Sequence, residues 1–573
     1  MNTIKASDFI AYFLQKKGIE SVFELSGGMI THILDSLHLT TDIKIITMHH
    51  EQAAAFAAEG YARITGLPGI ALATSGPGAT NLLTGMGSCF FDSTPAIFIT
   101  GQVNRHEQKG DRDIRQLGFQ ETDIVAMAKP ITKACFLVND PEDLESVFEQ
   151  AFKIALEGRP GPVLIDIPMD VQRSQITLKN NFAIEKDVPN IEKDLLEDLV
   201  KDIQNAKRPL ILSGRGIKAG NSQTLFDDFV KKVKVPVITT LLGLDTISFD
   251  DDLRVGFIGS YGNRWANIAF GECDLLIVLG SRLDIRQTGA DTKFIENRKI
   301  YHVDCEIGEL NNRVMGCIPI LAQLDIFFKE FAQTSVDFNV SNTWINRIEE
   351  LKSLWPDINE LTPTGINPNK FMHSMSGKGR AAKVYLADVG SHQMWAAQSL
   401  ELYKGQSFLT SGGMGAMGFS LPAGIGACIA LNNQPVVVIV GDGCMQINIQ
   451  ELQTIVRNKL KVKIVVLNNN TLGMIRQFQD SYFESRYQST YWGYSAPDFY
   501  KIATAYGIEA LTIEHPYQVE EGVNWLWSDE NVDKPQLLQV MVDPHTNTYP
   551  KIAFGKPITE MEPFAKPIEM EGT

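Results

Sequence analysis

Residues 436–470, VVVIVGDGCMQINIQELQTIVRNKLKVKIVVLNNN, constrain the fold more than any other part of the chain. The apolar runs VVVIV and VKIVVL flank a helical interval, and such runs are typical of buried strands in a parallel sheet. Each run ends in a polar turn, GDG at 441–443 and NNN at 468–470. Because the carboxyl ends of parallel strands meet at one edge of a sheet, we expect Asp442 and Asn469 to lie close together.

This edge offers the ligands that Mg²⁺ prefers. The Asp442 carboxylate, the Asn469 amide oxygen and a backbone carbonyl just beyond it, at Thr471, are hard oxygen ligands that leave positions open for water and diphosphate. Gly441 and Gly443 let the backbone approach a phosphate closely, and the helix that follows presents free N–H groups to it. A lone GDG usually marks only a tight turn, but the asparagine turn in the next strand favours a metal–diphosphate site.

The spacing of the GDG and NN motifs resembles that of thiamine-diphosphate (ThDP) enzymes. The flanking sequence is similar to the catalytic subunit of acetohydroxyacid (acetolactate) synthases, and the similarity extends from about Lys5 to Met561. It implies an α/β fold with three doubly wound parallel-sheet domains. We expect a pyrimidine-binding domain at 1–175, a central FAD-type domain at 190–335, a diphosphate- and Mg²⁺-binding domain at 365–548 and a C-terminal arm at 549–573.

Glu51 lies in MHHEQAAAFAAEGYAR, after a predicted strand and at the start of an alanine-rich helix. Taken alone, it is a helix-start acid placed favourably against the helix dipole. In ThDP enzymes the matching glutamate hydrogen-bonds N1′ of the cofactor's aminopyrimidine and relays a proton, so the resemblance implies a catalytic Glu51. Gly28, Phe119 and Gln120 match residues that line the space over the thiazolium ring.

Further cofactor contacts follow from the resemblance in the third domain. His392 and Gln393 lie in VGSHQMW, and Gly415 and Met417 lie in TSGGMGAMGF. Methionine is more often a core residue than a cofactor support, but Met417 is flanked by glycines and matches the apolar residue under the thiazolium. Met474 completes this set.

Three turns of the central region, at 213–220, 259–267 and 280–289, resemble the segments that cradle FAD in acetohydroxyacid synthases. Glycine-rich turns after strands are weak signals by themselves. The residues carried over from the resemblance are Arg215, Gly216, Gly259, Gly262, Arg282, Asp284 and Arg286. The flavin would do no net redox work. Ala322-Gln323 replaces the family's Gly-Asp, which alters the expected contacts on the adenine side.

The resemblance implies that a 2-keto acid is decarboxylated and that its two-carbon unit is passed to a carbonyl acceptor. The acceptor pocket departs from the family at two positions: Phe478 stands where the family has tryptophan, and Met169 where it has lysine. Arg286 matches the arginine that holds the acceptor carboxylate. The segment 104–117, NRHEQKGDRDIRQL, is longer than in the family and rich in charge, which usually means a solvated loop.

Two acceptors therefore remain open. The default is a second pyruvate, giving acetolactate, and the alternative is a keto sugar on a nucleotide carrier, as in branched-sugar biosynthesis. A pyruvate decarboxylase, a pyruvate oxidase or an inactive binding protein is less favoured, because Glu51 and the metal residues are present.

The whole chain excludes several other classes. A net charge of −16 without a basic stripe argues against nucleic-acid and anionic membrane partners. No apolar run reaches the ~18 residues that a membrane-spanning helix needs. Seven scattered cysteines predict free thiols, no zinc and a cytoplasmic protein. Because Glu51 and Asp442 must grip opposite ends of one cofactor, the resemblance implies a homodimer or tetramer with the site between subunits. The sequence leaves a regulatory subunit undetermined.

Overall fold

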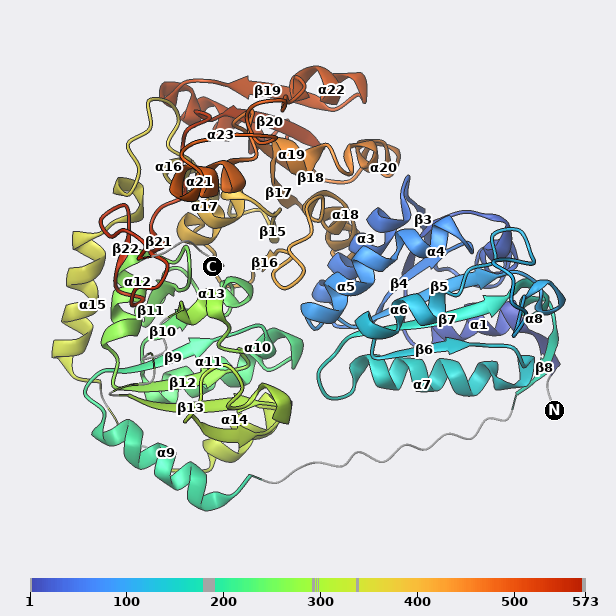
Figure 1. Ribbon diagram of the computed structural model, residues 1–573, viewed down its shortest axis with the longest axis horizontal. Coiled ribbons are helices and arrows are strands. Elements are labelled where there is room, and N and C mark those ends of the chain that lie inside the picture. Colours follow the sequence, from blue (N-terminus) through green and yellow to red (C-terminus); the bar gives the residue numbers. More distant parts are fainter. Residues whose placement is uncertain are drawn as a thin grey trace.

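A computed structural model describes residues 3–178, 191–290, 294, 296, 298–335, 338 and 340–568. These residues form three α/β domains, each built on a six-stranded sheet whose strands are all parallel. The predicted fold class is therefore confirmed. The domains lie around a common centre, with the N-terminal domain to the right in Figure 1 and the other two stacked on the left.

The N-terminal sheet has the strand order β3-β2-β4-β5-β7-β6. Every residue of β4, β5 and β7 is buried, which explains why these strands are mostly apolar. Of the buried exceptions, Thr100 and Gln102 donate hydrogen bonds to Asp166. The strands are β2 (Ser21–Leu25), β3 (Lys44–Thr47), β4 (Gly69–Ala73), β5 (Ala96–Gln102), β6 (Ala134–Leu137) and β7 (Pro162–Pro168), and the main helices are α1 (Ala6–Lys16), α2 (Thr31–Thr40), α3 (Glu51–Thr65), α5 (Leu83–Phe91) and α7 (Leu144–Leu156).

The central sheet has the order β11-β10-β9-β12-β13-β14. Its apolar strands are covered by helices on both faces, which form two separate buried clusters. The strands are β9 (Pro209–Ser213), β10 (Val237–Thr239), β11 (Arg254–Phe257), β12 (Leu275–Leu279), β13 (Lys299–Asp304) and β14 (Ile318–Leu321), and the main helices are α9 (Lys193–Asn205), α11 (Gln223–Val233), α12 (Arg264–Glu272) and α14 (Leu324–Ala332).

The segment from Thr334 to Lys370 reads as a polar linker in the sequence, but this prediction is wrong for part of it. Helix α15 (Asn342–Leu354) occupies its centre, and Trp344 and Leu351 are buried in the core of the central domain. The Trp344 indole donates to the Pro209 carbonyl at 3.1 Å. Apolar residues at helical spacing among polar ones give an amphipathic helix, not an irregular connection. The segment 177–190 also reads as a polar linker in the sequence, and it falls mostly outside the described residues.

The C-terminal sheet has the order β16-β15-β17-β18-β20-β19, and β17 pairs with β18 in parallel. Between these two strands the chain forms the short helices α19 (Asp442–Met445) and α20 (Leu452–Arg457), where the sequence predicts one helical interval. The strands are β15 (Val384–Ala387), β16 (Ser407–Leu409), β17 (Val436–Gly441), β18 (Val462–Asn468), β19 (Glu509–Ile513) and β20 (Gln536–Met541), and the main helices are α16 (Pro368–Lys378), α17 (Ser391–Ser399), α18 (Ser420–Ala430), α21 (Gly473–Tyr482), α22 (Phe499–Ala505) and α23 (Val519–Leu526).

Helices α3 and α18 join the two outer domains and lie side by side in Figure 1. A Cβ atom added at Gly60 would lie 2.1 Å from the Ala423 carbonyl oxygen, and one at Gly426 would lie 1.9 Å from that of Ala57. The two helices therefore touch backbone to backbone, and this close approach requires glycine at both positions.

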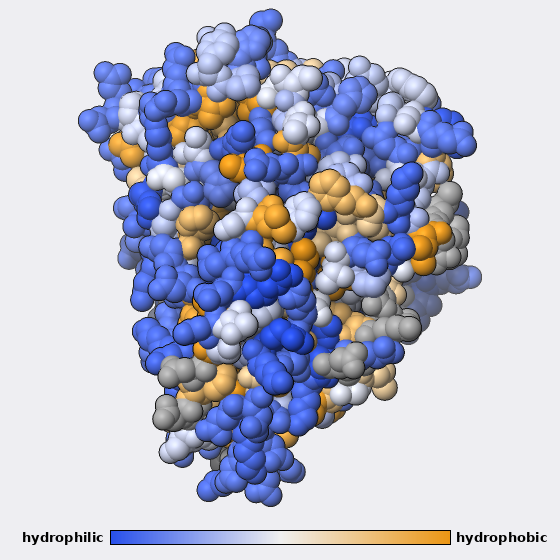
Figure 2. Space-filling model, turned by 90° about the vertical axis from the view of Figure 1, so that its left-hand side faces the viewer, coloured by the Kyte–Doolittle hydropathy of each residue, from blue (hydrophilic) through white to orange (hydrophobic). Residues whose placement is uncertain are grey.

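The chain returns to the central domain after β20. The hairpin β21 (Lys551–Ile552) and β22 (Met561–Glu562) lies against α12, where Arg264 donates to the carbonyls of Met561 and Glu562 at 3.3 and 3.0 Å. On the face shown in Figure 2, hydrophilic side chains surround separate apolar patches. Within the ranges that the structure describes, none of the helices combines the length and apolar character needed to cross a membrane.

Candidate active site and its neighbouring cavity

The turns after β17 and β18 bring Asp442 and Asn469 together, and both side chains are buried. In the structure the Asn469 amide oxygen lies 3.2 Å from Asp442 Oδ1 and 2.8 Å from the Thr471 carbonyl oxygen, so three oxygens surround one point. Without a cation between them, the amide would satisfy both oxygens by turning over, so that its nitrogen donates to each. The set of three oxygens is the one that a small hard cation requires, so the residues present fit Mg²⁺.

The Asp442 carboxylate is in an environment suited to a cation. Burial raises its pKa to about 7, while hydrogen bonds from the Tyr494 hydroxyl and from the backbone N–H groups of Gly443 and Thr471 lower it. Burial disfavours the charged form of a carboxyl group, and a cation beside it restores that form. A cation bound beside the buried Asp442 carboxyl would therefore favour its charged form.

A cavity opens beside this pair of turns, and most of the predicted cofactor residues line it. Arg286 and Phe478, which the sequence assigns to the acceptor pocket, are part of the same wall. The predicted residues that line the cavity are Arg286, His392, Gln393, Gly415, Met417, Gly441, Asp442, Gly443, Asn469, Thr471, Met474 and Phe478.

Three buried polar groups of residues in the cavity wall, Ser391 Oγ, His392 Nε2 and Trp395 Nε1, have no hydrogen-bond partner among the described residues, and the first two lie side by side in the chain. These two belong to the first turn of α17, and burial lowers the pKa of His392 to about 3, so the ring is neutral. A Cβ atom at Gly390 or at Gly441 would lie 2.8 Å from this ring, so both glycines make room for it. Unpaired polar groups at a helix start suit the oxygens of a diphosphate.

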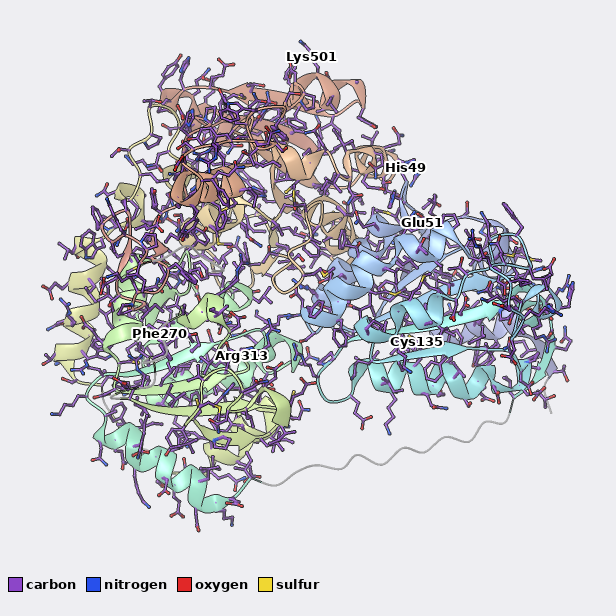
Figure 3. The ribbon with its side chains drawn as sticks, viewed as in Figure 1. His49, Glu51, Cys135, Phe270, Arg313 and Lys501 are labelled. Carbon is purple, nitrogen blue, oxygen red and sulfur yellow. The ribbon has the colours of Figure 1, made fainter. Side chains whose placement is uncertain are left out.

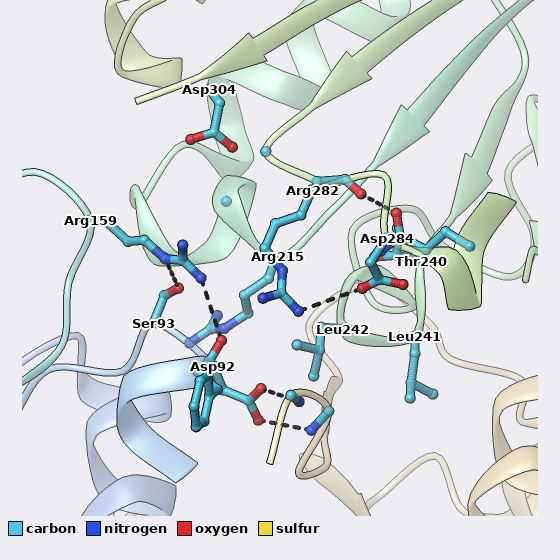
Figure 4. A pocket seen from close by; sticks show the side chains of 18 of the residues that line it. Asp92, Ser93, Arg159, Arg215, Thr240, Leu241, Leu242, Arg282, Asp284 and Asp304 are labelled. Atoms are coloured by element: carbon cyan, nitrogen blue, oxygen red, sulfur yellow. Dashed lines mark hydrogen bonds and ion pairs between the residues drawn. The ribbon is translucent and has the colours of Figure 1, made fainter. Parts of the chain in front are cut away.

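A second cavity lies between the N-terminal and central domains, where Arg159, Arg215 and Arg282 converge (Figure 4). The Arg215 Nε is buried without a hydrogen-bond partner in the described chain, and burial lowers the pKa of this residue to about 10. With Arg286, four arginines line this cavity, and such a set fits an anionic ligand such as the diphosphate of a dinucleotide. Of the predicted FAD residues, Arg215, Gly216, Arg282, Asp284 and Arg286 line this cavity.

Gly259 and Gly262 are absent from the lining of the second cavity, although Ser260 and Tyr261 between them belong to it. The two glycines pack on one another behind the wall, where a Cβ at Gly262 would lie 2.7 Å from the Gly259 nitrogen. Ala322 and Gln323, the departure noted in the sequence, also line this cavity. The two cavities are neighbours because Ser260, Tyr261, Arg286 and Met394 line both.

The catalytic residues predicted in the N-terminal domain gather around the turn at 74–78. Thr74 Oγ1 accepts from the Met29 N–H, beside Gly28, at 3.2 Å. On the other side of the turn, a Cβ at Gly76 would lie 3.0 Å from Gln120, and one at Gly78 would lie 3.3 Å from Glu51 Oε1. The glycine-rich turn thus brings three predicted site residues to one edge of the sheet.

Glu51 begins α3, is buried and accepts from the Asn81 amide at 2.9 Å. Phe119 is 80% exposed, and Gln120 has a positive φ of 66°. None of Gly28, Glu51, Phe119 and Gln120 is among the residues found to line the cavity that contains Asp442 (Glu51 is labelled in Figure 3).

Met169 also lies away from that cavity, in α8 (Met169–Gln172) of the N-terminal domain. Its neighbour Asp170 pairs with Arg105 of the long 104–117 segment at 2.7 Å. Within one chain, Phe478 and Arg286 line the same cavity as the turns that carry Asp442 and Asn469. Glu51 and Met169 are not among the residues that line it.

Some residues of the site carry no signal that reveals them in the sequence. Tyr494 reaches the turn at 441–443 from an irregular loop, and Lys551 reaches the cavity from the C-terminal hairpin. Ser391 lies inside the VGSHQMW stretch, but the sequence singled out only its neighbours His392 and Gln393. Arg159 lies in the stretch GRPGP, which reads as a loop.

Comparison with known families identifies the architecture. The model described as "Thiamine pyrophosphate enzyme, N-terminal TPP binding domain" matches residues 4–127, the central-domain model of the same family matches 196–331, and its C-terminal TPP binding domain matches 388–540. The chain therefore belongs to the thiamine pyrophosphate enzymes, and its two outer domains match the modules that bind thiamine pyrophosphate, which is ThDP. This confirms the resemblance seen in the sequence.

Individual relatives narrow the similarity within that family. The chain is 34% identical over 561 residues to "Acetolactate synthase large subunit" of Lactococcus lactis subsp. lactis (strain IL1403), covering 97% of this chain and 95% of the relative. It is 34% identical over 558 residues to "Acetolactate synthase isozyme 2 large subunit" of Escherichia coli (strain K12), covering 97% and 99%. The large subunit of Pyropia yezoensis is 36% identical over 575 residues, covering 96% and 94%.

Proposed function

We propose that this enzyme decarboxylates pyruvate and transfers the two-carbon unit to a carbonyl acceptor, by default a second pyruvate, which gives acetolactate. The relatives named above are acetolactate synthase large subunits, and they match this chain over nearly its whole length. The observation that carries the proposal is the convergence of Asp442, Asn469 and the α17 start on one cavity at the edge of the third sheet.

In this proposal the two turns hold Mg²⁺ and the start of α17 holds the diphosphate. Asp442, Asn469 and the Thr471 carbonyl are the metal ligands, while Ser391 and His392 hydrogen-bond diphosphate oxygens. Met417 lies in the wall of the same cavity and supports the thiazolium ring. Bound ThDP supplies the nucleophilic carbon and accepts the electron pair that decarboxylation releases.

The rest of the cavity wall controls water and orients the acceptor. Met474, Ile475 and Phe478 are apolar side chains on α21 that line the cavity, and a dry wall favours loss of a charged carboxylate. The Arg286 guanidinium would hold the carboxylate of a keto-acid acceptor through a bidentate contact. Gly28, Phe119 and Gln120 would cover the thiazolium from the opposite side.

Glu51 would hold and move a proton at the aminopyrimidine. In this proposal the Glu51 that does so belongs to a second copy of the chain. Its own chain leaves it outside the Asp442 cavity, so the proposed unit is a homodimer, alone or within a tetramer. Met169 and the 104–117 segment would reach the acceptor side with the same partner domain. The printed names of the relatives also include the term large subunit, so we include a separate regulatory subunit as a candidate partner.

We propose FAD as the ligand of the second cavity, on the basis of Arg159, Arg215 and Arg282. Purified protein should carry FAD or take it up without consuming oxygen in proportion to product. Arg215→Ala should lower the flavin content measured by absorbance, because it removes a buried guanidinium that faces the cavity. A flavin-free preparation with full activity and no gain from added FAD would overturn this assignment.

The acceptor has one alternative, a 4-keto sugar carried on a nucleotide. Arg112 and Arg115 on the exposed 104–117 segment could bind its phosphates, and Phe478 presents a smaller ring to the acceptor than the tryptophan expected from the resemblance. One methylene of lost contact corresponds to about 1–3 kcal/mol of discrimination, so preference for 2-ketobutyrate should be poor.

A competition assay tests both acceptors. The enzyme is given pyruvate with an equal concentration of 2-ketobutyrate, then pyruvate with a 4-keto nucleotide sugar, and the products are identified by mass. Acetolactate as the main product supports the default acceptor. A coupled nucleotide sugar would move the alternative to first place, and strong selection for acetohydroxybutyrate would contradict the altered pocket. Absence of any ThDP-dependent pyruvate consumption would overturn the proposal.

A further inference from the structure

A loop that follows α21 is hydrogen-bonded to the turn after β18, which carries Asn469. We call this turn and the turn at 441–443 the two metal turns. We call residues 487–496 the clasp loop. The carbonyl of Thr490 accepts from Thr471 Oγ1 at 2.8 Å and from the Leu472 N–H at 3.0 Å, and Thr490 is only 3% exposed. Further along, the Ala496 N–H donates to Asn470 Oδ1 at 2.9 Å. Two separate parts of the loop therefore hold the turn that carries Asn469.

The same loop reaches the first metal turn through Tyr494. Its hydroxyl donates to Asp442 Oδ2 at 3.2 Å. A Cβ atom at Gly443 would lie 3.3 Å from this hydroxyl, so the glycine of the GDG motif leaves room for it. The clasp loop thus bridges the two turns, which are far apart in the sequence and meet only at the edge of the sheet.

The two oxygens of Asp442 have different neighbours. Oδ1 faces the Asn469 amide at 3.2 Å, on the side where the Thr471 carbonyl also points, and Oδ2 accepts from Tyr494. The tyrosine is therefore bonded to the oxygen that faces away from the cation position. A hydrogen bond there fixes the rotation of the carboxylate and keeps Oδ1 pointing at Asn469, without competing for the cation.

We propose that Tyr494 is a positioning residue that orients Asp442 for Mg²⁺, and that the clasp loop sets the spacing of the two metal turns. The inference rests on the proposed function, in which these turns hold the cation. Partners that hydrogen-bond a metal ligand orient it, and their loss typically costs 10–100-fold in metal affinity. A ligand that is already ordered also loses less conformational freedom when the ion binds.

The clasp loop is also tied to the wall of the cavity. Thr490 Oγ1 donates to Gln479 Oε1, and Gln479 Nε2 donates to the Gln488 carbonyl at 3.0 Å. Gln479 lies on α21, the helix that carries Met474 and Phe478 into the cavity. If cation binding orders the clasp loop through Tyr494 and Asp442, these hydrogen bonds would also order α21 and the side chains that it contributes to the cavity wall.

The test compares Tyr494→Phe with Tyr491→Phe. Each substitution removes one hydroxyl from the same loop, but the Tyr491 hydroxyl forms no hydrogen bond with the described residues. The full-length proteins are titrated with Mg²⁺ at fixed ThDP, and ThDP binding is followed by calorimetry in the absence of pyruvate. We expect the Mg²⁺ concentration at half-saturation to rise about 10-fold in Tyr494→Phe and to stay unchanged in Tyr491→Phe.

An unchanged or tighter Mg²⁺ response in Tyr494→Phe would overturn the positioning role, because the hydroxyl would then be neutral or a competitor of the cation. An equal loss in both variants would also overturn it, since the effect would belong to the loop in general. If the wild-type protein binds ThDP without any divalent cation, the metal site of the proposed function fails, and the inference fails with it. Equal melting temperatures of the two variants exclude misfolding as the cause of a difference.

Discussion

At the residue scale, the site depends on a few carboxylates whose positions are set by the ends of strands and helices. Asp442 follows the last residue of β17, and Glu51 is the first residue of α3. Their neighbours differ: Asp442 faces an amide and a tyrosine hydroxyl, and Glu51 faces the Asn81 amide. These surroundings suit one carboxylate to a metal and the other to a hydrogen bond with a ring nitrogen.

Replacement of Glu51 tests its role in proton transfer. Glu51→Gln keeps the shape of the side chain and removes its acidity. Because a general acid–base group contributes about 10²–10⁴-fold, turnover of pyruvate should fall by that factor while ThDP binding measured by calorimetry persists. Asn81→Asp provides a comparison at the hydrogen-bonded neighbour. Turnover of Glu51→Gln at the wild-type rate would remove Glu51 from the mechanism.

Sequence reasoning found Asp442 and Asn469 because the strand-end rule fixes where such residues meet. The family resemblance supplied Glu51, His392 and Met417, of which His392 and Met417 line the cavity beside Asp442. Sequence reasoning could not find Tyr494, because its contact with Asp442 depends on how a loop without a regular pattern folds back. It included the stretch that contains Ser391 but did not single that residue out, because its unpaired hydroxyl depends on the direction of the side chain. Gly259 and Gly262 were predicted to contact FAD, but they lie behind the wall of the second cavity and do not line it.

At the element scale, the α3–α18 contact holds the N-terminal and C-terminal domains together. Gly426→Ala would place a methyl group 1.9 Å from the Ala57 carbonyl oxygen. Overpacking of this kind typically costs about 1–3 kcal/mol, so the melting temperature should fall. Gly365→Ala is the matched control, because a Cβ there meets nothing within 4 Å. Equal melting temperatures for the two variants would show that the helices separate easily.

His373 on α16 bonds two carboxylates on neighbouring segments, and the strength of these bonds depends on whether the histidine is protonated. His373 bonds Asp357 through Nε2 at 2.9 Å and Glu401 through Nδ1 at 3.0 Å, and its side chain is 26% exposed. Burial by itself would lower the pKa of His373, but the hydrogen bonds and charges of Asp357 and Glu401 raise it to about 9. Burial lowers the pKa of the neighbouring Arg254 to about 10, and burial together with Glu401 raises the pKa of Tyr403 to about 12. Both values lie above pH 9, so His373 is the group of this cluster that changes charge most between pH 6.5 and 9.

The sign of the pH effect follows from the raised pKa. The contribution of His373 to stability is complete below its ordinary value of about 6.5 and is lost as the pH rises through about 9. It amounts to about 3 kcal/mol when fully present. The melting temperature of the wild type should therefore fall relative to that of His373→Gln between pH 6.5 and 9. Parallel curves for the two proteins across this interval would contradict the assignment.

Secondary structure was predictable where the pattern was strong. β17 and β18 are buried on both faces, so their sequences are almost purely apolar and mark strands clearly. Helix α15 was missed because only a few apolar residues at helical spacing interrupt a polar stretch. The interval after β17 was predicted as one helix, but the chain breaks it into two short helices separated by a turn.

At the scale of the whole molecule, the predicted site residues fall into two groups: one group lines the cavity beside Asp442, and Gly28, Glu51, Phe119 and Gln120 are not among the residues that line it. The third domain supplies the metal turns and the cavity, and the first domain supplies Glu51 at the edge of another sheet. The sequence predicted this division only through the family resemblance, since no pattern in one chain reveals where a second copy docks. The structure adds that Met169 and the 104–117 segment belong to the same domain as Glu51 and are joined to each other by the Arg105–Asp170 pair.

Complementation between two inactive variants tests most directly the claim that two copies complete one ThDP site. Glu51→Gln and Asp442→Ala chains carrying different affinity tags are expressed together, and assemblies with both tags are purified. One of the two sites in such a dimer would combine the intact Glu51 of one chain with the intact Asp442 of the other. We expect each variant alone to lack pyruvate turnover and the mixed assembly to recover up to about half of the wild-type rate per dimer. A mixed assembly as inactive as its components would contradict the shared site.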